Sequence, residues 1–331
     1  MKQTTVFESV GVDVSSQELH AWFRSSDRDG VHQVYENTAE GIIQMINFLG
    51  SRGQGSPIVM ESTGRYHYLC ATMLNENGFY VSVINPLLVK KYQQSRIRKT
   101  KTDKIDANIL AEVGAKEKEL PRFVCSREDI HLRQKISLIC SLEKTLQKCS
   151  ASMSNYEKSL EKTKGELSPD EATVKEIIEQ LKKQKDKLEK EVVRLISVQP
   201  QHVESFGLLK TIPGVSPFMA CLALFFYSFD KGKKSRQWVA YTGMDITVLE
   251  SGNWKGHGHL AKRGNKYLRK RWFSAAWGAM MHSEEFGVYY KHLKEEGRAH
   301  TEALNIIARK LVRITHHIMK TKQPFNPGKA F

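Results

Sequence analysis

The stretch Val6-Phe-Glu-Ser-Val-Gly11-Val-Asp13-Val14 is the apolar run that decides the fold of the first third of the chain. It is long enough for one buried strand, and it carries a carboxylate, Asp13, at its end. Glu18–Ser25 alternates apolar and polar residues, and Asp29-Gly30 then provides a hairpin turn into Val31–Glu36. The pattern predicts three consecutive strands joined by short connections.

Helices and strands alternate after these three strands. Thr38 can cap a helix whose isoleucines share one face, and Gly50 ends it. The further elements that we expect are a strand at Pro57–Met60 ending at Glu61, a helix near Tyr66–Asn75, a strand at Phe79–Ile84, and helices from about Leu87 and through Asp106–Lys116. The order β-β-β-α-β-α-β-α matches the ribonuclease-H-like fold. We therefore expect an α/β domain over residues 1–120.

Residues 128–198 have the pattern of a helical hairpin. Apolar residues recur at alternating spacings of 3 and 4 from Ile139 to Leu160 and from Val174 to Leu195, with Lys185 as a polar exception. Sustained heptads of this kind are typical of coiled coils. We expect a coiled-coil hairpin that joins subunits into a dimer or tetramer; a purely intramolecular hairpin is the alternative.

Residues 205–331 are predicted to form a mainly helical third domain. Pro213-Gly214 lies between two helical patterns. It can be interpreted as the phosphate-binding turn of a helix-hairpin-helix module or as a plain turn between two helices. A glycine-rich loop is expected from Gly243 to Gly264, followed by helices over Lys266–His282 and Thr301–Lys320.

The composition points to a soluble protein with a polyanionic partner. The chain has 331 residues, 40% of them hydrophobic, which is enough for two or three domains with buried cores. Its formal net charge of +15 favours a polyanionic partner such as nucleic acid. It shows no apolar run long enough for a membrane helix, no secretory signal, and five scattered cysteines without a Cys-x-x-Cys pair. We expect no membrane partner and a cytoplasmic protein of a prokaryote, associated with the nucleoid.

Much of the positive charge lies in two blocks, Lys90–Lys104 and Lys231–Arg271. The second block is interleaved with aromatic residues, which can stack on unpaired bases or belong to the core. Two such blocks favour contacts with a phosphate backbone over a merely solvated basic face. The residues expected to contact nucleic acid are Lys90, Lys91, Arg96, Arg98, Lys99, Lys101, Lys262, Arg263, Lys266 and Arg269.

Four acids of the first domain could form a metal site. Asp13 and Glu61 end strands that lie side by side in a ribonuclease-H-like sheet, and Asp103 and Asp106 lie one helical turn apart. Carboxylates without histidine or cysteine suit Mg²⁺ or Mn²⁺, and two such ions could clamp a phosphodiester. Each acid also has a structural interpretation: an Asx turn at Asp13, the first turn of a helix at Glu61, and helix capping at the aspartate pair.

The motifs of the chain resemble those of the DEDD transposases of the insertion sequence 110/1111 family, relatives of the Piv DNA invertase. The N-terminal motifs are Gly11-Val-Asp13-Val-Ser, Glu61-Ser-Thr-Gly64-Arg-Tyr66, Val83-Ile-Asn85-Pro86 and Lys101-Thr-Asp103-Lys-Ile-Asp106-Ala. The C-terminal motifs are Ile212-Pro-Gly214-Val, Ala240-Tyr-Thr-Gly243, Glu250-Ser251-Gly252 and Lys262-Arg-Gly264-Asn-Lys-Tyr-Leu268-Arg269. One departure is Ile246, where family members commonly have proline, so the local loop shape is in question.

This resemblance implies a RuvC-like nuclease domain in which Asp13, Glu61, Asp103 and Asp106 hold Mg²⁺. It also implies a C-terminal transposase domain whose nucleophile is Ser251, activated by the metal, with a covalent phosphoserine–DNA intermediate and strand exchange between donor and target double-stranded DNA. The family further uses a structured guide, the bridge RNA. A site-specific invertase with the same chemistry, a hydrolytic RuvC-like nuclease and a non-catalytic nucleic-acid scaffold are the alternatives.

Overall fold

The computed structural model describes residues 6–25, 30–62, 64–94, 102–228, 234–247, 250–251, 254–255 and 258–329, with the backbone alone at 250–251 and 254–255. The chain divides into two compact units, Met1–His131 and Leu132–Phe331. The boundary falls within a long helix, α5 (Arg127–Thr163). The finer division into domains at 1–120, 128–198 and 205–331 remains a prediction.

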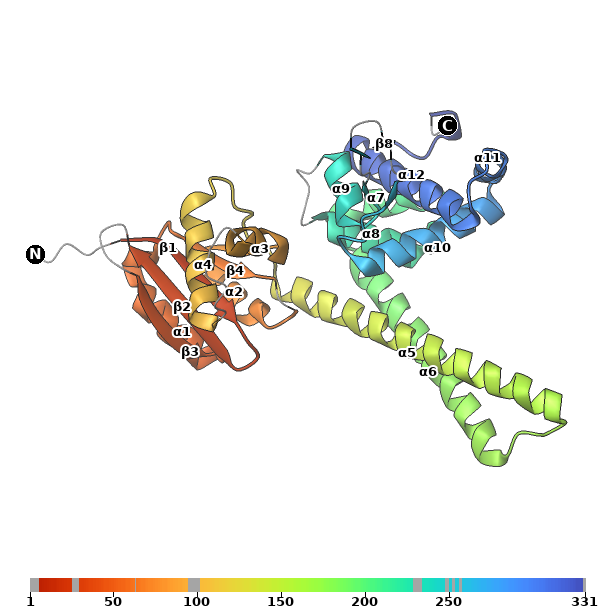
Figure 1. The fold of residues 1–331 in the computed structure, drawn as a ribbon, viewed down its shortest axis with the longest axis horizontal. Helices are drawn as coiled ribbons and strands as arrows, with labels where there is room; N and C mark the ends of the chain where they lie inside the picture. Colours follow the sequence, from red (N-terminus) through yellow and green to blue (C-terminus); the bar gives the residue numbers. More distant parts are fainter. Residues whose placement is uncertain are drawn as a thin grey trace, which may run out of the picture. The chain divides into compact units, whose positions relative to one another are not determined.

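The first unit is built on a mixed five-stranded sheet (Figure 1). Its strands are β1 (Phe7–Val14), β2 (Glu18–Ser25), β3 (Val31–Glu36), β4 (Pro57–Glu61) and β5 (Tyr80–Ile84). Their order across the sheet is β3-β2-β1-β4-β5, with antiparallel pairs on the β2 side of β1 and parallel pairs on the β4 side. The predicted strands and their order along the chain are confirmed. Since β1 pairs with β4, the strands that end near Asp13 and at Glu61 are neighbours.

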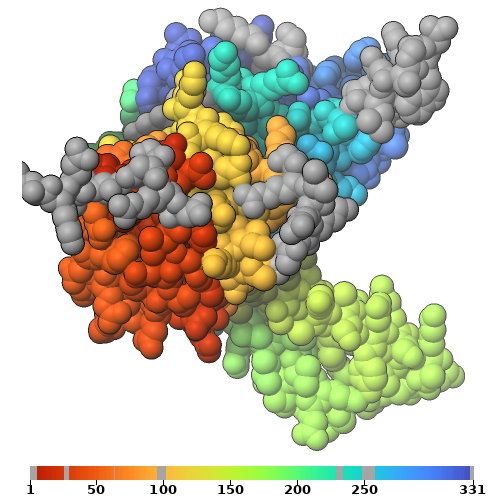
Figure 2. Space-filling model, turned by 60° about the vertical axis from the view of Figure 1, so that its left-hand side comes forward, coloured from red at the N-terminus to blue at the C-terminus, as the bar shows by residue number. Residues whose placement is uncertain are grey.

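Helices cover both faces of this sheet. They are α1 (Ala39–Leu49), the 3-10 turn η1 (Gly50–Gly53), α2 (His67–Glu76), α3 (Pro86–Gln94) and α4 (Asp103–Lys116). Thr38 caps α1 through its side chain, as predicted. One core joins the sheet to α1 and α2, and a smaller core on the other face joins it to α3 and α4. In the space-filling view, the gold and yellow side chains of α4 lie against the red surface of the first strands (Figure 2).

Gly11 allows α4 to pack directly on the backbone of β1. A Cβ atom at Gly11 would lie 2.0 Å from the carbonyl oxygen of Ala107 and 2.2 Å from the amide nitrogen of Ala111. Two residues earlier on β1, the Ser9 hydroxyl donates to the Ala111 carbonyl at 2.7 Å. As α4 advances, its contacts move back along β1, so the start of α4 lies at the end of β1 that carries Asp13.

The second unit begins with the helical hairpin of α5 and α6 (Pro169–Ser197), as predicted. Ser168 and Glu171 form a capping box at the start of α6. The two helices are tied by Lys175–Glu157 at 2.7 Å and by Lys135–Glu191 at 2.5 Å. The loop end of the hairpin extends away from the other helices of this unit (Figure 1).

The apolar seam of the hairpin is buried unevenly. Its buried positions are Ile139, Leu146, Ile178 and Val192. Towards the loop end, Tyr156 is 41% exposed and Val174 is 50% exposed. The hairpin is therefore shown, whereas coiled-coil pairing with another subunit stays a prediction.

The rest of the second unit is a helical bundle. Its helices are α7 (Pro200–Leu209), α8 (Pro217–Ser228), α9 (Ser235–Tyr241), α10 (Lys266–His282), α11 (Glu284–Glu295) and α12 (His300–Thr321), followed by the 3-10 turn η2 (Pro327–Lys329). α8 is buried on nearly all sides at the centre of this core. At Gly214, which has a φ of +77°, an added Cβ would lie 2.1 Å from the carbonyl oxygen of Ala275 in α10. This turn therefore packs against α10, which favours the interhelix-turn interpretation over a phosphate-binding turn.

The predicted glycine-rich loop contains two short antiparallel ladders. β6 (Ile246–Thr247) pairs with β9 (His259–Leu260), and β7 (Glu250–Ser251) pairs with β8 (Trp254–Lys255). Among the described residues, no helix is both long enough and apolar enough to cross a membrane.

Candidate active site

Asp13 and Glu61 lie side by side on one face of the sheet. The parallel ladder between β1 and β4 pairs Gly11 with Val59 and Val12 with Met60, so the two acids follow one residue beyond the last of these pairs. Gly11 and Val59 both face α4, since each lies against its backbone or side chains. Residues two apart on a strand share a face, so both carboxylates project on the α4 side of the sheet.

The first turn of α4 brings two more carboxylates to this end of the sheet. Thr102 caps the helix, its side chain accepting from the amide of Ile105, and Asp103 and Asp106 follow in the first turn. The Asp103 carboxylate lies 3.7 Å from Nε2 of His20, the residue that pairs with Asp13 across β1 and β2. Asp106 accepts a hydrogen bond from the side-chain amide of Gln93 at 3.0 Å.

The electrostatics of Asp13 show that the acids influence one another. Burial raises the pKa of Asp13 above its usual value, and the negative charges of Asp106 and Asp103 raise the pKa further. His20 and the backbone amide of Val14 act in the opposite direction. When several carboxylates lie close together, each one disfavours the ionisation of the others, and a bound cation offsets this repulsion.

The donor set fits a hard divalent ion, although the side chains do not yet close around one. All four acids offer only carboxylate oxygen, the ligand type that Mg²⁺ and Mn²⁺ prefer. Within the described parts of the chain, no three histidine, cysteine, aspartate or glutamate side chains come near enough to coordinate one ion. Holding a metal here would require the carboxylates to come closer together than they are in this structure.

The structural interpretations of two of these acids do not match the fold. Thr102, not Asp103, is the residue that caps α4. Glu61 is the last residue of β4, and α2 does not begin until His67, so Glu61 is not in the first turn of a helix. The capping interpretation of Asp103 and the helix-start interpretation of Glu61 are therefore wrong.

Ser251 lies in the second unit, on the short hairpin of β7 and β8. Its backbone pairs with Trp254, and the neighbouring Glu250 pairs with Lys255. The structure describes only the backbone at these four positions.

Comparison with known proteins gives one consistent family. A family of transposases of the DEDD, IS110 type matches residues 10–156, and the family described as "Transposase IS116/IS110/IS902 family" matches residues 207–291. The chain belongs to the IS110 family of transposases. The first match covers the four acids of the sheet unit, and the second covers Ser251.

Curated relatives span nearly the whole transposase. The "Pilin gene-inverting protein" of Moraxella lacunata is 24% identical over 96% of this chain and 97% of its own length. The protein of the same name from Moraxella bovis is 23% identical over the same shares. The "Insertion element IS116 uncharacterized 44.8 kDa protein" of Streptomyces clavuligerus is 26% identical over 37% of this chain and 31% of its own length.

The basic residues predicted to contact nucleic acid differ in their surroundings. Lys90 and Lys91 of α3 are exposed, as are Lys262, Arg263 and Lys266 near the start of α10. Arg269 is half-buried, and its Nη1 atom packs beneath Gly243. The other predicted contacts, Arg96, Arg98, Lys99 and Lys101, lie outside the described residues. Trp238 of the second block and Trp272 directly after it are fully buried, so these two aromatics belong to the core.

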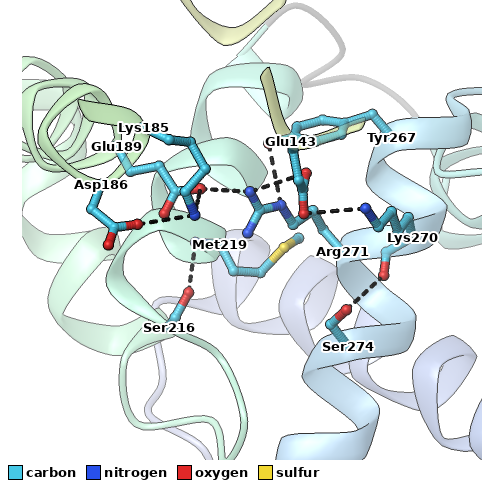
Figure 3. A network of polar contacts seen from close by, with 10 residues as sticks. All are labelled: Glu143, Lys185, Asp186, Glu189, Ser216, Met219, Tyr267, Lys270, Arg271 and Ser274. Atoms are coloured by element: carbon cyan, nitrogen blue, oxygen red, sulfur yellow. Dashed lines mark hydrogen bonds and ion pairs between the residues drawn. The ribbon is translucent and has the colours of Figure 1, made fainter. Parts of the chain in front are cut away.

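The end of the second basic block has a structural role in the transposase. The Arg271 guanidinium lies 2.6 Å from Glu189 on α6 and 3.4 Å from Glu143 on α5, and Lys270 lies 3.2 Å from Glu143 (Figure 3). Lys185, the polar exception in the heptads, lies 3.5 Å from Glu189 in the same network. Lys270 and Arg271 thus join α10 to the hairpin, and the positive charge of this block is not wholly available to nucleic acid.

The sequence alone did not reveal two neighbours of the acids. His20 lies in a strand whose alternation is visible, but only the pairing of β1 with β2 places it opposite Asp13. Gln93 sits near the end of α3, and no motif connects it to Asp106. Both residues become recognisable only when the sheet and α4 have assembled.

Proposed function

We propose that this transposase cleaves and exchanges DNA strands through two groups of residues: the four carboxylates of a ribonuclease-H-like, RuvC-like unit and the hydroxyl of Ser251. The observation that carries the proposal is that Asp13 and Glu61 occupy matching positions on the neighbouring strands β1 and β4, on the face that α4 covers. Helix α4, with Asp103 and Asp106 in its first turn, begins at the same end of the sheet. Four acids from three elements gather at one end of the sheet, and two of them raise the pKa of Asp13.

Asp13, Glu61, Asp103 and Asp106 would hold Mg²⁺ or Mn²⁺. When bound, such an ion neutralises phosphate oxygens and lowers the pKa of a coordinated hydroxyl. The protein's own part is to fix the acids: Gly11 lets α4 approach β1, Thr102 sets the start of α4, and Gln93 orients Asp106. His20, 3.7 Å from Asp103, limits the positions that this carboxylate takes.

Ser251 is proposed as the nucleophile that attacks the phosphorus of the DNA backbone. The bond from Oγ to phosphorus forms as one phosphorus–oxygen ester bond of the strand breaks, and the proton lost by the serine balances the proton gained by the leaving hydroxyl. One phosphodiester replaces another, so the strand can be rejoined to a new partner without hydrolysis. The reverse attack by a DNA hydroxyl on the phosphoserine restores Ser251.

The proposed partners are double-stranded donor and target DNA and a structured guide RNA, the bridge RNA. Exposed Lys90, Lys91, Lys262, Arg263 and Lys266 support a polyanionic partner. Assembly into a dimer or tetramer is supported by the exposed apolar side chains near the loop end of the hairpin. A protein acting on DNA in this way works in the cytoplasm, at the nucleoid.

A site-specific inversion of DNA is the second candidate outcome. Its support is that two proteins described as pilin gene-inverting proteins align over 96% of the chain. Inversion and transposition share the chemistry proposed here and differ in the arrangement of the two DNA sites. A plasmid carrying two sites in inverted orientation separates the outcomes, because inversion retains all the DNA of the plasmid.

The proposal is tested with Ser251→Ala and Asp106→Asn in a plasmid recombination assay. Both variants should lose recombination while keeping their thermal transition. Full recombination by Ser251→Ala would refute the serine chemistry, and cleavage without rejoining would indicate a hydrolytic nuclease. Sequencing of RNA that copurifies with the protein tests the guide; a single structured RNA encoded beside the gene is the expected result.

A further inference from the structure

The second unit contains a basic groove along α12, most of whose basic residues lie outside the two basic blocks of the sequence. Two adjoining depressions, of about 1020 Å³ and about 590 Å³, share Arg309 and Arg313 in their walls. The larger one continues past Lys310 and His317 to the segment after α12, and the smaller one reaches Arg236 on α9 and Ile246 on β6. The labels of α9, α11 and α12 locate this region in Figure 1.

The two shared arginines form no ion pair with the residues that the structure describes. Among the same residues, Nε of Arg309 is buried without a hydrogen-bond partner. Burial and the charge of Arg313 both lower the pKa of Arg309, and Asp245 opposes them only in part. An unsatisfied buried donor beside a like charge destabilises a folded protein, so this arrangement needs a separate explanation.

Arg271 provides the contrast. It lies on the same unit, and its guanidinium is held by Glu189 and Glu143. Arg309 and Arg313, which line the groove, form no such ion pair with the described residues. Arginine pairs of this kind match phosphate oxygens, to which the guanidinium donates two parallel hydrogen bonds.

The groove ends at the base of the segment that carries the proposed nucleophile. Ile246 lines the smaller depression and starts β6, and Ser251 follows five residues later on β7. Asp245, beside it, is the acid of the lining, and it approaches neither arginine closely enough for an ion pair. The groove lining and the proposed nucleophile therefore lie within five residues of each other along the chain.

We propose that the α12 groove binds the phosphate backbone of the DNA strand next to the bond that is cleaved, with Arg309 and Arg313 as positioning residues. This proposal rests on the proposed function of Ser251. It adds a second phosphate-binding surface to the exposed lysines near α10. It also explains why the buried Nε of Arg309 has no hydrogen-bond partner among the described residues, at a cost to stability.

The test is DNA binding by Arg309→Met and Arg313→Gln, measured in EDTA so that it depends neither on cleavage nor on Ser251. The probe is a fluorescein-labelled duplex DNA, titrated at several salt concentrations. Each variant should bind about tenfold more weakly, and the slope of log affinity against log salt should fall by about 0.9 for each arginine. Lys320→Gln, which removes one charge from an exposed position of the same helix, is the matched control and should bind nearly as well as the wild type.

Thermal unfolding separates a binding role from a structural role. Removing the unpaired Nε and the repulsion from Arg313 should leave Arg309→Met at least as stable as the wild type, although it binds DNA more weakly. Lower stability with unchanged DNA affinity would overturn the proposal. The proposal would also be overturned if the variants lost affinity only for an RNA probe of the same length, because the groove would then bind RNA and not DNA. Unchanged DNA binding in variants of a protein that still forms a Ser251 adduct would refute the groove and spare the proposed function.

Discussion

Replacing Gly11 by alanine tests whether the contact between β1 and α4 positions the acids. The added Cβ would lie 2.0 Å from the carbonyl oxygen of Ala107, and ordinary contacts begin at 3.4 Å. Helix α4 must therefore retreat by roughly 1.4 Å at this point or the strand must bend. Because backbone atoms of the helix are the obstacle, no rotation of a side chain relieves the clash.

Two effects follow, and they differ in size. Overpacking of this kind costs about 1–3 kcal/mol of the free energy of unfolding, which leaves the unit folded. A shift of about 1 Å in Asp103 and Asp106 relative to Asp13 should lower the rate of DNA cleavage about 100-fold. The variant should thus lose far more activity than stability.

The assay compares cleavage of a supercoiled plasmid in Mg²⁺ with thermal unfolding followed by circular dichroism. Gly207→Ala is the matched control, since Gly207 lies in α7 with nothing within 4 Å of an added Cβ. That substitution should raise stability by up to about 1 kcal/mol through helix propensity and leave cleavage unchanged. Wild-type cleavage by a folded Gly11→Ala protein would show that the approach of α4 does not position the acids.

Three further predictions concern charge and assembly. Asp103→Asn should abolish cleavage. Without metal it should leave the melting temperature unchanged or higher, because it removes a negative charge that raises the pKa of Asp13. A clear loss of stability would instead assign Asp103 a structural role. Arg271→Met should lower the free energy of unfolding by about 2–3 kcal/mol in urea titrations, since the half-buried Glu189 loses its hydrogen bond at 2.6 Å; a change below about 0.5 kcal/mol would show that the network is not needed. Val174→Asp, at a side chain 50% exposed near the hairpin loop, should reduce the oligomer seen by sedimentation without altering the helix content; an unchanged oligomer would remove the hairpin loop end from the interface.

Local periodicity was enough to predict most of the elements. The bounds of β2 and β3 agree with Glu18–Ser25 and Val31–Glu36, and α10 agrees with Lys266–His282. These segments have either strict alternation or clear end signals. Helix α4 begins at Asp103 rather than Asp106, because Thr102 is the better cap. The ladders of β6 to β9 were not predicted, since two-residue strands are too short to show a period.

Contacts between distant residues could not be predicted in the same way. The basic block predicts charge but not its partner, and Glu189 lies 82 residues from Arg271. Whether the buried Nε of Arg309 finds a partner among the described residues likewise depends on which groups the fold brings near it. Asp13 and Glu61, by contrast, could be placed together, because the order of elements matched the ribonuclease-H-like fold, in which the two strands that carry them are neighbours.

The central claim is that Ser251 attacks DNA with the help of the four acids, and trapping the intermediate tests it most directly. The protein is incubated with Mg²⁺ and end-labelled substrate DNA, denatured, digested and examined by mass spectrometry. We predict a nucleotide adduct on Ser251 that is absent from both Ser251→Ala and Asp106→Asn. Cleaved DNA with free ends and no adduct on any serine, or an adduct of undiminished yield in Asp106→Asn, would contradict the account.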